Sequence, residues 1–265
     1  MSRYAIATLL LASNAALVEP DVRVPAGPFQ MGCSAGDRAC DKDEGPEGGV
    51  AVEVPEFFID KTEVTVAAYR VCARAGKCTV PQKPNNPRDH YCNYGVAGRD
   101  EHPVNCVDWH QANAYCAWRG KRLPWEPEWE KAARAGSKTA FPNGQRISCK
   151  EAVLNDGSTT GSVAGELDGC GEDRTDSAGS RPPNVLGLHD MHGNVVEWTA
   201  SWYAPSATAG LYAKGNLRGP AEGERRVARG GAWDTKAANA RSSFRDPRKP
   251  EQFGGSLGFR CARSP

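Results

Sequence analysis

Ten cysteines are the residues of this sequence with the widest range of chemistry, and their number is even. Cysteines of a cytosolic enzyme commonly bind metals or carry out redox reactions, whereas those of a secreted chain commonly form disulfides. The N-terminus favours disulfides, because Arg3 precedes an apolar run from Ala5 to Leu11 and then small residues, the pattern of a signal peptide. We therefore expect residues 1–17 to be a signal peptide, residues 18–265 to form a single domain, and the protein to be secreted or periplasmic. The alternative for the N-terminal run is a buried strand or helix.

Histidines are the other candidates for metal chemistry. The five are His90, His102, His110, His189 and His192. No two of them have the i, i+4 spacing that places two imidazoles on one face of a metalloprotease helix. We therefore do not expect a transition-metal site.

Charge and composition exclude several classes of partner. The chain has 33 basic and 32 acidic residues without a basic stripe, so we expect neither nucleic acid nor an anionic membrane surface as a partner. No apolar run is long enough for a transmembrane helix. The high content of glycine (29) and proline (19) predicts many turns and little regular secondary structure.

Short helices and strands must position the remaining residues. Capping residues at the start and glycines at the end predict three helices: residues 66–75, 109–119 and 126–135. Alternation of apolar and polar residues predicts strands: residues 22–31, interrupted by a turn, 50–59, 227–229 and 257–260. Residues 141–183 show no periodicity, and such a long irregular stretch needs disulfides or a bound cation to order it.

Seven segments, in this order, resemble motifs of the formylglycine-generating enzyme (sulfatase-modifying factor) family. They are PAGPFQMG (25–32), EVT (63–65), PVNCVDWHQANAYCAWRGKRLP (103–124), EWEKAAR (128–134), GLHDMHGNVVEW (187–198), RGGAW (229–233) and GFRCA (258–262). The resemblance spans nearly all of the mature chain. It implies an α+β fold related to C-type lectins, with much irregular structure and several disulfides.

The resemblance also implies an activity whose residues are missing here. Enzymes of this family oxidise a sulfatase cysteine to formylglycine with O2 and copper, using two cysteines five residues apart that follow the Gly-Gly motif. Counted from Gly230 and Gly231, those positions are Thr235 and Ala240. A hydroxyl and a methyl group cannot replace the thiolates that select Cu(I). We therefore predict a binding or recognition domain without catalytic residues or copper. A formylglycine-generating oxidase, or another oxidase of a protein cysteine, is the alternative.

Disulfides are expected to involve all ten cysteines. The family resemblance implies a bridge between Cys116 and Cys261, with a buried free thiol at Cys116 as the alternative. Short spacing suggests the other pairs: Cys33 with Cys40, Cys72 with Cys78, Cys92 with Cys106, and Cys149 with Cys170. Ten cysteines allow about 945 pairings, so these local pairs are one hypothesis among many.

Calcium is the cofactor that the resemblance implies. The family binds it at a loop that matches residues 190–197, where Asp190 and Glu197 would supply side-chain oxygens and Gly193 and Val195 carbonyl oxygens. The alternative is that Glu197 pairs with an arginine and Asp190 caps a turn. A second family site is expected near residues 155–170, where Asn155, Asp156 and Asp168 are available.

A ligand groove is expected where the family has its catalytic centre. By analogy, Trp233, Asp234, Arg241 and Arg245 line it, and such a set could bind an extended peptide or a carbohydrate. The alternative is that Trp233 belongs to the core and that the two arginines are solvated or ion-paired.

Overall fold

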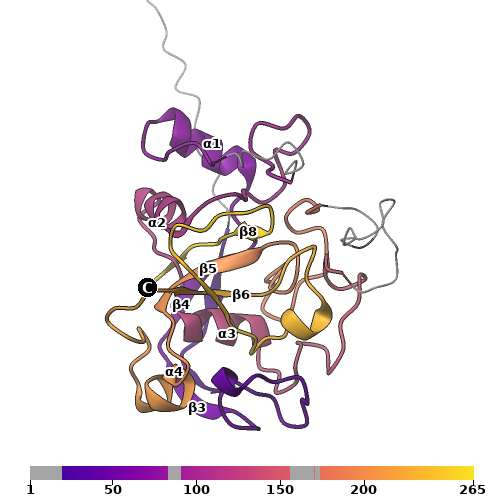
Figure 1. The fold of residues 1–265 in the computed structure, drawn as a ribbon, viewed down its shortest axis with the longest axis vertical. Helices are drawn as coiled ribbons and strands as arrows, with labels where there is room; N and C mark the ends of the chain where they lie inside the picture. Colours follow the sequence, from indigo (N-terminus) through magenta and orange to yellow (C-terminus); the bar gives the residue numbers. More distant parts are fainter. Residues whose placement is uncertain (1–19, 83–90, 156–169, 171–173) are drawn as a thin grey trace, which may run out of the picture.

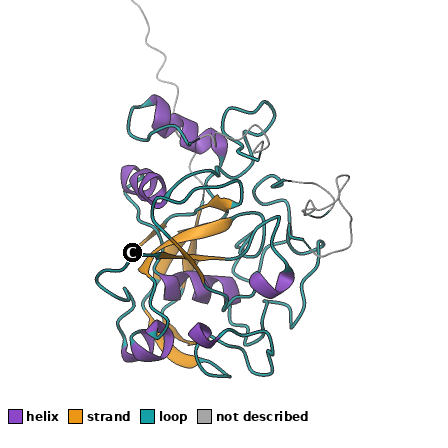
Figure 2. Ribbon diagram, in the orientation of Figure 1, coloured by secondary structure: helices purple, strands orange, loops and turns teal. Residues whose placement is uncertain are grey.

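The computed structural model describes residues 20–82, 91–155, 170 and 174–265. Short helices and strands are joined by long loops around a central sheet (Figures 1 and 2). This mixed, loop-rich architecture is the α+β class predicted from the sequence. The predicted signal peptide lies outside the described residues, as do His90, Asp156 and Asp168.

Strands of the described part form three small sheets. The first has the order β1 (Asp21–Val24), β4 (Phe57–Asp60), β9 (Ala262–Arg263). The second pairs β2 (Gly27–Met31) with β3 (Val50–Val54), and the third has the order β7 (Asp246–Arg248), β6 (Arg226–Arg229), β5 (Val196–Trp202), β8 (Leu257–Gly258). Within this third sheet β5 runs antiparallel to β6 and parallel to β8, so β5 and β6 are both paired along two sides.

The strands differ from the prediction in several places, since β7 and β9 were not expected and β8 covers only the first two residues of the predicted strand 257–260. The strand expected over residues 50–59 is two strands, because Pro55, which has no N–H to donate, lies between β3 and β4 and they join different sheets. Strand β5 was not expected at all, since its buried run VEWTASW does not alternate.

The three predicted helices are confirmed: α1 (Val66–Arg74), α2 (Trp109–Trp118) and α3 (Glu126–Arg134). Thr65 Oγ1 accepts a 3.2 Å hydrogen bond from the Ala68 N–H and starts α1, and Asp108 with Gln111 forms a capping box at α2. Shorter turns of helix follow elsewhere: η2 (Lys42–Glu44), α4 (Ala207–Gly210), η3 (Tyr212–Lys214) and η4 (Ala237–Asn239). No helix of the described residues is both long and apolar enough to cross a bilayer.

Five disulfides connect these elements: Cys33–Cys40, Cys72–Cys78, Cys92–Cys106, Cys116–Cys261 and Cys149–Cys170. These are the same five pairs that spacing and resemblance indicated, and all ten cysteines are therefore oxidised. Disulfides form and persist in oxidising compartments, so this set indicates a location outside the cytoplasm.

Candidate functional site

Thr235 and Ala240, the positions of the family's cysteine pair, lie in the loops after β6. The Ala240 methyl group is fully buried and packs with Ala140 and Phe141. Gly231 has φ of +70°, and a Cβ built there would lie 2.7 Å from Ala240 Cβ, so the Gly-Gly turn packs directly against this position. Thr235 Oγ1 donates to Asp234 Oδ1 at 3.4 Å. With every cysteine of the chain in a disulfide, no thiol is present at this site.

The structure does not bring the four expected groove residues into one open surface. Trp233 is 5% exposed, lies in the core against Tyr91 and donates its indole N–H to Gly255 O. Arg241 and Arg245 are 3% and 4% exposed. Asp234 is partly exposed, and burial raises the pKa of its carboxyl. Trp233, Arg241 and Arg245 expose too little to line a groove, so only Asp234 of the four reaches the surface.

Carboxylates hold both of these arginines in the interior. Arg241 donates to both oxygens of Glu44 at 2.6 Å and to Asp37 Oδ2 at 3.1 Å. Arg245 donates to Glu126 Oε1 at 2.7 Å and Oε2 at 2.9 Å. Their guanidinium groups therefore hold η2 and α3 against the loop after β6 and are engaged by the protein itself.

The expected calcium loop lies beside a cluster of three buried carboxylates and one guanidinium. Glu63, Glu197 and Arg260 are fully buried, and Asp190 is 6% exposed. Arg260 Nη2 donates to Glu197 Oε1 at 2.6 Å and Arg260 Nε to Glu197 Oε2 at 2.7 Å, while Trp129 Nε1 also donates to Oε2 at 2.7 Å. Glu197 thus has an arginine partner, as the alternative interpretation of the loop supposed.

Glu63 and Asp190 are the two carboxylates of this cluster that keep an unpartnered oxygen. Asp190 Oδ2 accepts from the Gly179 N–H at 2.5 Å, and Glu63 Oε1 accepts from Asn194 Nδ2 at 3.0 Å. Asp190 Oδ1 and Glu63 Oε2 are buried without a hydrogen-bond donor. In the sequence, Glu63 was recognised only as part of the EVT segment (63–65) and not as a candidate site residue. Nothing local in the sequence shows that it faces Asp190.

The charge of this cluster is not balanced by its own residues, since one guanidinium faces three carboxylates. Burial raises the pKa of both the Glu63 and the Asp190 carboxyls, and the proximity of Asp190 raises that of Glu63 further. A buried carboxylate needs a proton or a cation to compensate it. The two unpartnered oxygens therefore fit a hard cation, although no group of three or more acidic, histidine or cysteine side chains among the described residues is arranged as a metal site.

Of the three residues expected at a second calcium site, Asn155 alone lies among the described residues. Its backbone N–H donates to Thr235 O at 3.0 Å, which ties this end of the irregular segment to the first of the two motif positions.

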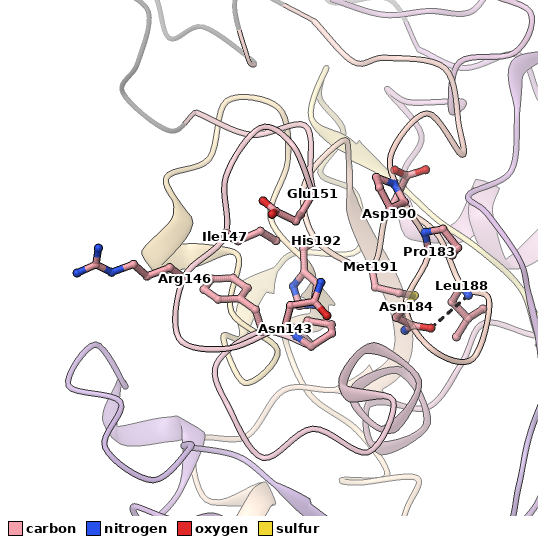
Figure 3. Close-up of a pocket in the computed structure, with 13 residues that line it drawn as sticks. Asn143, Arg146, Ile147, Glu151, Pro183, Asn184, Leu188, Asp190, Met191 and His192 are labelled. Carbon is pink, nitrogen blue, oxygen red and sulfur yellow. Dashed lines mark hydrogen bonds between the residues drawn. The ribbon is translucent and has the colours of Figure 1, made fainter.

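Asp190 also lines a small pocket with a volume of about 50 Å³. Figure 3 shows His192 in the middle of it near Asn143, with the Arg146 guanidinium pointing away. His192 Nδ1 lies 2.7 Å from Ala240 O, so Nδ1 carries the proton and Nε2 is a buried acceptor without a partner. Burial lowers the pKa of His192 to about 4, so the ring is neutral near pH 7.

The comparisons with known proteins decide the family. A model described as the sulfatase-modifying factor enzyme 1-like domain matches residues 8–265. The chain belongs to this family. The formylglycine-generating enzyme of Streptomyces coelicolor is 30% identical over 91% of this chain and 88% of its own length.

Two further relatives show the range of this family. A mouse protein named inactive C-alpha-formylglycine-generating enzyme 2 is 39% identical over 64% of this chain and 52% of its own length. A chlamydial protein named serine/threonine-protein kinase pkn1 (Chlamydia pneumoniae) is 31% identical over 92% of this chain, which spans only 38% of that protein.

Solved structures agree with the family assignment. The structure of PvdO from Pseudomonas aeruginosa matches with a TM-score of 0.76 and 30% identity, covering 92% of this chain and 94% of PvdO. The Treponema denticola variable protein 1 matches with a TM-score of 0.67 and 22% identity over 92% of this chain and 95% of its own, which shows a shared fold.

Proposed function

We propose that this family member is a secreted or periplasmic recognition domain that does not oxidise protein cysteines with copper. One observation supports this most: all ten cysteines are in disulfides, and the motif positions of the cysteine pair are Thr235 and Ala240. The family's Cu(I) site and its thiol–disulfide exchange both use thiolates, which Thr235 and Ala240 cannot provide. The substrate classes that we propose for recognition are an extended peptide or a carbohydrate.

An assay on a sulfatase-derived peptide tests this proposal. The mature chain is incubated with the peptide, copper and O2, and conversion of the cysteine to formylglycine is followed by mass spectrometry. The formylglycine-generating enzyme of Streptomyces coelicolor serves as the positive control. We expect no conversion of the peptide. We also expect the chain to bind Cu(I) no more tightly than the same sulfatase peptide with its cysteine replaced. Turnover comparable with that of the control enzyme would overturn the proposal.

We also propose that the domain binds Ca²⁺ next to the loop 190–197. The unpartnered oxygens of Asp190 and Glu63 support this, together with the excess of carboxylates over guanidinium groups around them. Gly193 and Val195 would contribute carbonyl oxygens from the same loop. Glu197, which the family resemblance also assigns to the ion, would have to share its oxygens with Arg260. Bound Ca²⁺ would supply positive charge and order the loop, and we assign it no catalytic step.

A further inference from the structure

An open groove beside α2 and the central sheet contains three tryptophans and three arginines. They are Trp109, Trp125, Trp202, Arg122, Arg218 and Arg226. The groove has a volume of about 590 Å³, and no aspartate or glutamate is among its lining residues. Figure 1 shows α2 next to β5, the strand that ends at the groove. The lining is therefore aromatic and cationic.

Arg226 lies between two indole rings. Its Cζ is 3.4 Å from the centroid of Trp202, its partner across the β5–β6 ladder, and 3.9 Å from that of Trp109. Nη1 donates to Ala200 O at 2.6 Å, while Nε is buried without an acceptor. Burial lowers the pKa of Arg226 to about 10, and no carboxylate among the described residues forms an ion pair with it. The guanidinium is thus fixed in position, cationic at neutral pH, and short of acceptors.

Two more arginines flank the third tryptophan. Arg122 and Arg218 lie over the Trp125 ring at 5.4 and 5.6 Å from its centroid. Arg122 also pairs with Glu128 at 2.6 Å, but Arg218 is exposed and has no ion-pair partner within the described residues. Arg218 and Arg226 therefore contribute two uncompensated positive charges to one groove, which is complementary to an anionic ligand.

The arrangement of the strands indicates what kind of anion fits. A peptide bound through its backbone would need a free strand edge. Strand β6 is paired on both sides, and β5 is paired with β8 only at Val196 and Glu197. Near the groove, the Ala200 N–H of β5 donates to Pro124 O at 2.8 Å and its carbonyl oxygen accepts from Arg226, so these backbone groups are not available to a peptide. The groove instead offers guanidinium groups and the side-chain amides of Asn113 and Asn216, groups that bind carboxylates or sulfates and hydroxyls.

We propose that this groove binds an acidic oligosaccharide, whose carboxylate or sulfate groups contact Arg218 and Arg226 and whose hydroxyls contact the amides. The inference rests on the proposed recognition role and names its ligand class and its location. The proposed surface is not at the family's catalytic position, where the arginines are buried in ion pairs. It lies at the ends of β5 and β6 that are farthest from the Gly-Gly turn.

Calorimetric titrations of the mature chain test the proposal. The probes are a heparin hexasaccharide for sulfate, a galacturonate hexamer for carboxylate, a neutral dextran oligomer, and a glutamate hexapeptide for the acidic-peptide alternative. We expect one or both acidic sugars to bind, with an affinity that falls as salt rises, and the neutral sugar not to bind. Arg226→Gln should lower the affinity about tenfold or more, because it removes charged hydrogen bonds. The exposed Arg218→Gln should lower it about threefold.

Controls keep the outcomes distinct. Arg38→Gln removes an equal charge from an exposed site outside the groove and should leave the affinity unchanged. Thermal melts show whether the Arg226→Gln variant still folds. If that variant does not fold, the Arg218→Gln variant still tests the groove. Absence of binding to both acidic sugars, or tighter binding of the glutamate peptide, would overturn the inference. Neither result would affect the peptide-oxidation assay, which tests the proposed function separately.

Discussion

Arg260 and Glu197 form an ion pair in which both side chains are fully buried and Nη2 lies 2.6 Å from Oε1. Arg260 also donates to the carbonyl oxygens of Asp60, Lys61 and His189, so one guanidinium joins β4, the loop before β5, and β5 itself. Burial alone would lower the pKa of Arg260, but the charge and hydrogen bonds of Glu197, together with the charges of Glu63 and Asp190, raise it above the ordinary value, so the group stays charged. The pair therefore acts as a fixed internal connection.

Removal of Arg260 should destabilise the domain strongly. Arg260→Gln leaves the Glu197 carboxylate buried without its charge partner, and we expect the free energy of unfolding to fall by about 3–5 kcal/mol. Urea denaturation measures it. Arg263→Gln is the matched control, because Arg263 pairs with Asp21 at 2.7 Å near the surface, and its loss should cost less than about 1 kcal/mol. Equal effects of the two variants would contradict this account of Arg260.

Removal of calcium should lower stability if a cation balances Asp190 and Glu63. We expect EDTA to reduce the melting temperature and excess Ca²⁺ to restore it, with a gain of roughly 2.7 kcal/mol when the ion is at a hundred times its dissociation constant. Asp190→Asn should abolish most of this response. A wild-type protein whose melting is indifferent to both EDTA and Ca²⁺ would instead indicate a proton shared between the two carboxyls.

Acid should weaken the domain partly through Glu126. Burial alone would raise the pKa of this carboxyl, but Arg245 and Arg229 outweigh burial and hold it below the ordinary value of 4.5. A carboxyl whose pKa is lower in the folded state stabilises the fold above its unfolded pKa and loses that contribution as the pH falls through the folded value. The free energy of unfolding should therefore decrease below about pH 4.5, and it should decrease less steeply in Glu126→Gln. Parallel pH profiles for the two proteins would exclude Glu126 as a contributor.

The disulfides should differ in their effect on stability. Cys116–Cys261 spans 145 residues and Cys33–Cys40 spans seven. In the loop-entropy model the long bridge stabilises by about 4–5 kcal/mol and the short one by about 2 kcal/mol. Paired Cys→Ser variants of each bridge, compared by denaturation under non-reducing conditions, measure the difference. A larger loss of stability on removal of the short bridge would show that strain in the folded chain or residual structure in the unfolded chain outweighs loop entropy.

Local signals predicted the helices well. The Thr65 and Asp108 caps act within three residues of themselves, so the sequence alone identifies where α1 and α2 begin. The family motifs likewise indicated the Cys116–Cys261 bridge from α2 to the C-terminal segment, because each of its cysteines lies inside one of the seven motif segments.

Ion pairing of Arg241, Arg245 and Glu197 was an alternative in the sequence analysis, but the partners of the buried ion pairs could not be predicted in this way. An arginine in a sequence is expected at the surface, yet Arg229 is fully buried and donates to Glu130, 99 positions away. Arg241 meets Glu44 across 197 positions and Arg245 meets Glu126 across 119. Such partners are set by tertiary packing, which is why the expected groove at Arg241 and Arg245 is an interior network and why Glu63 was missed at the carboxylate cluster.

The first and last strands of the described domain flank the same central strand, and Arg263 on β9 pairs with Asp21 on β1 at 2.7 Å. Both strands run antiparallel to β4, so they are parallel to each other, and chain entering β1 and chain leaving β9 lie at opposite ends of this sheet. A circularly permuted chain, with new ends in an exposed loop, would therefore need a linker that runs the length of this sheet to keep all three sheets intact. The ion pair between Arg263 and Asp21 reaches from one edge strand to the other and so fastens the start of the described domain to its end.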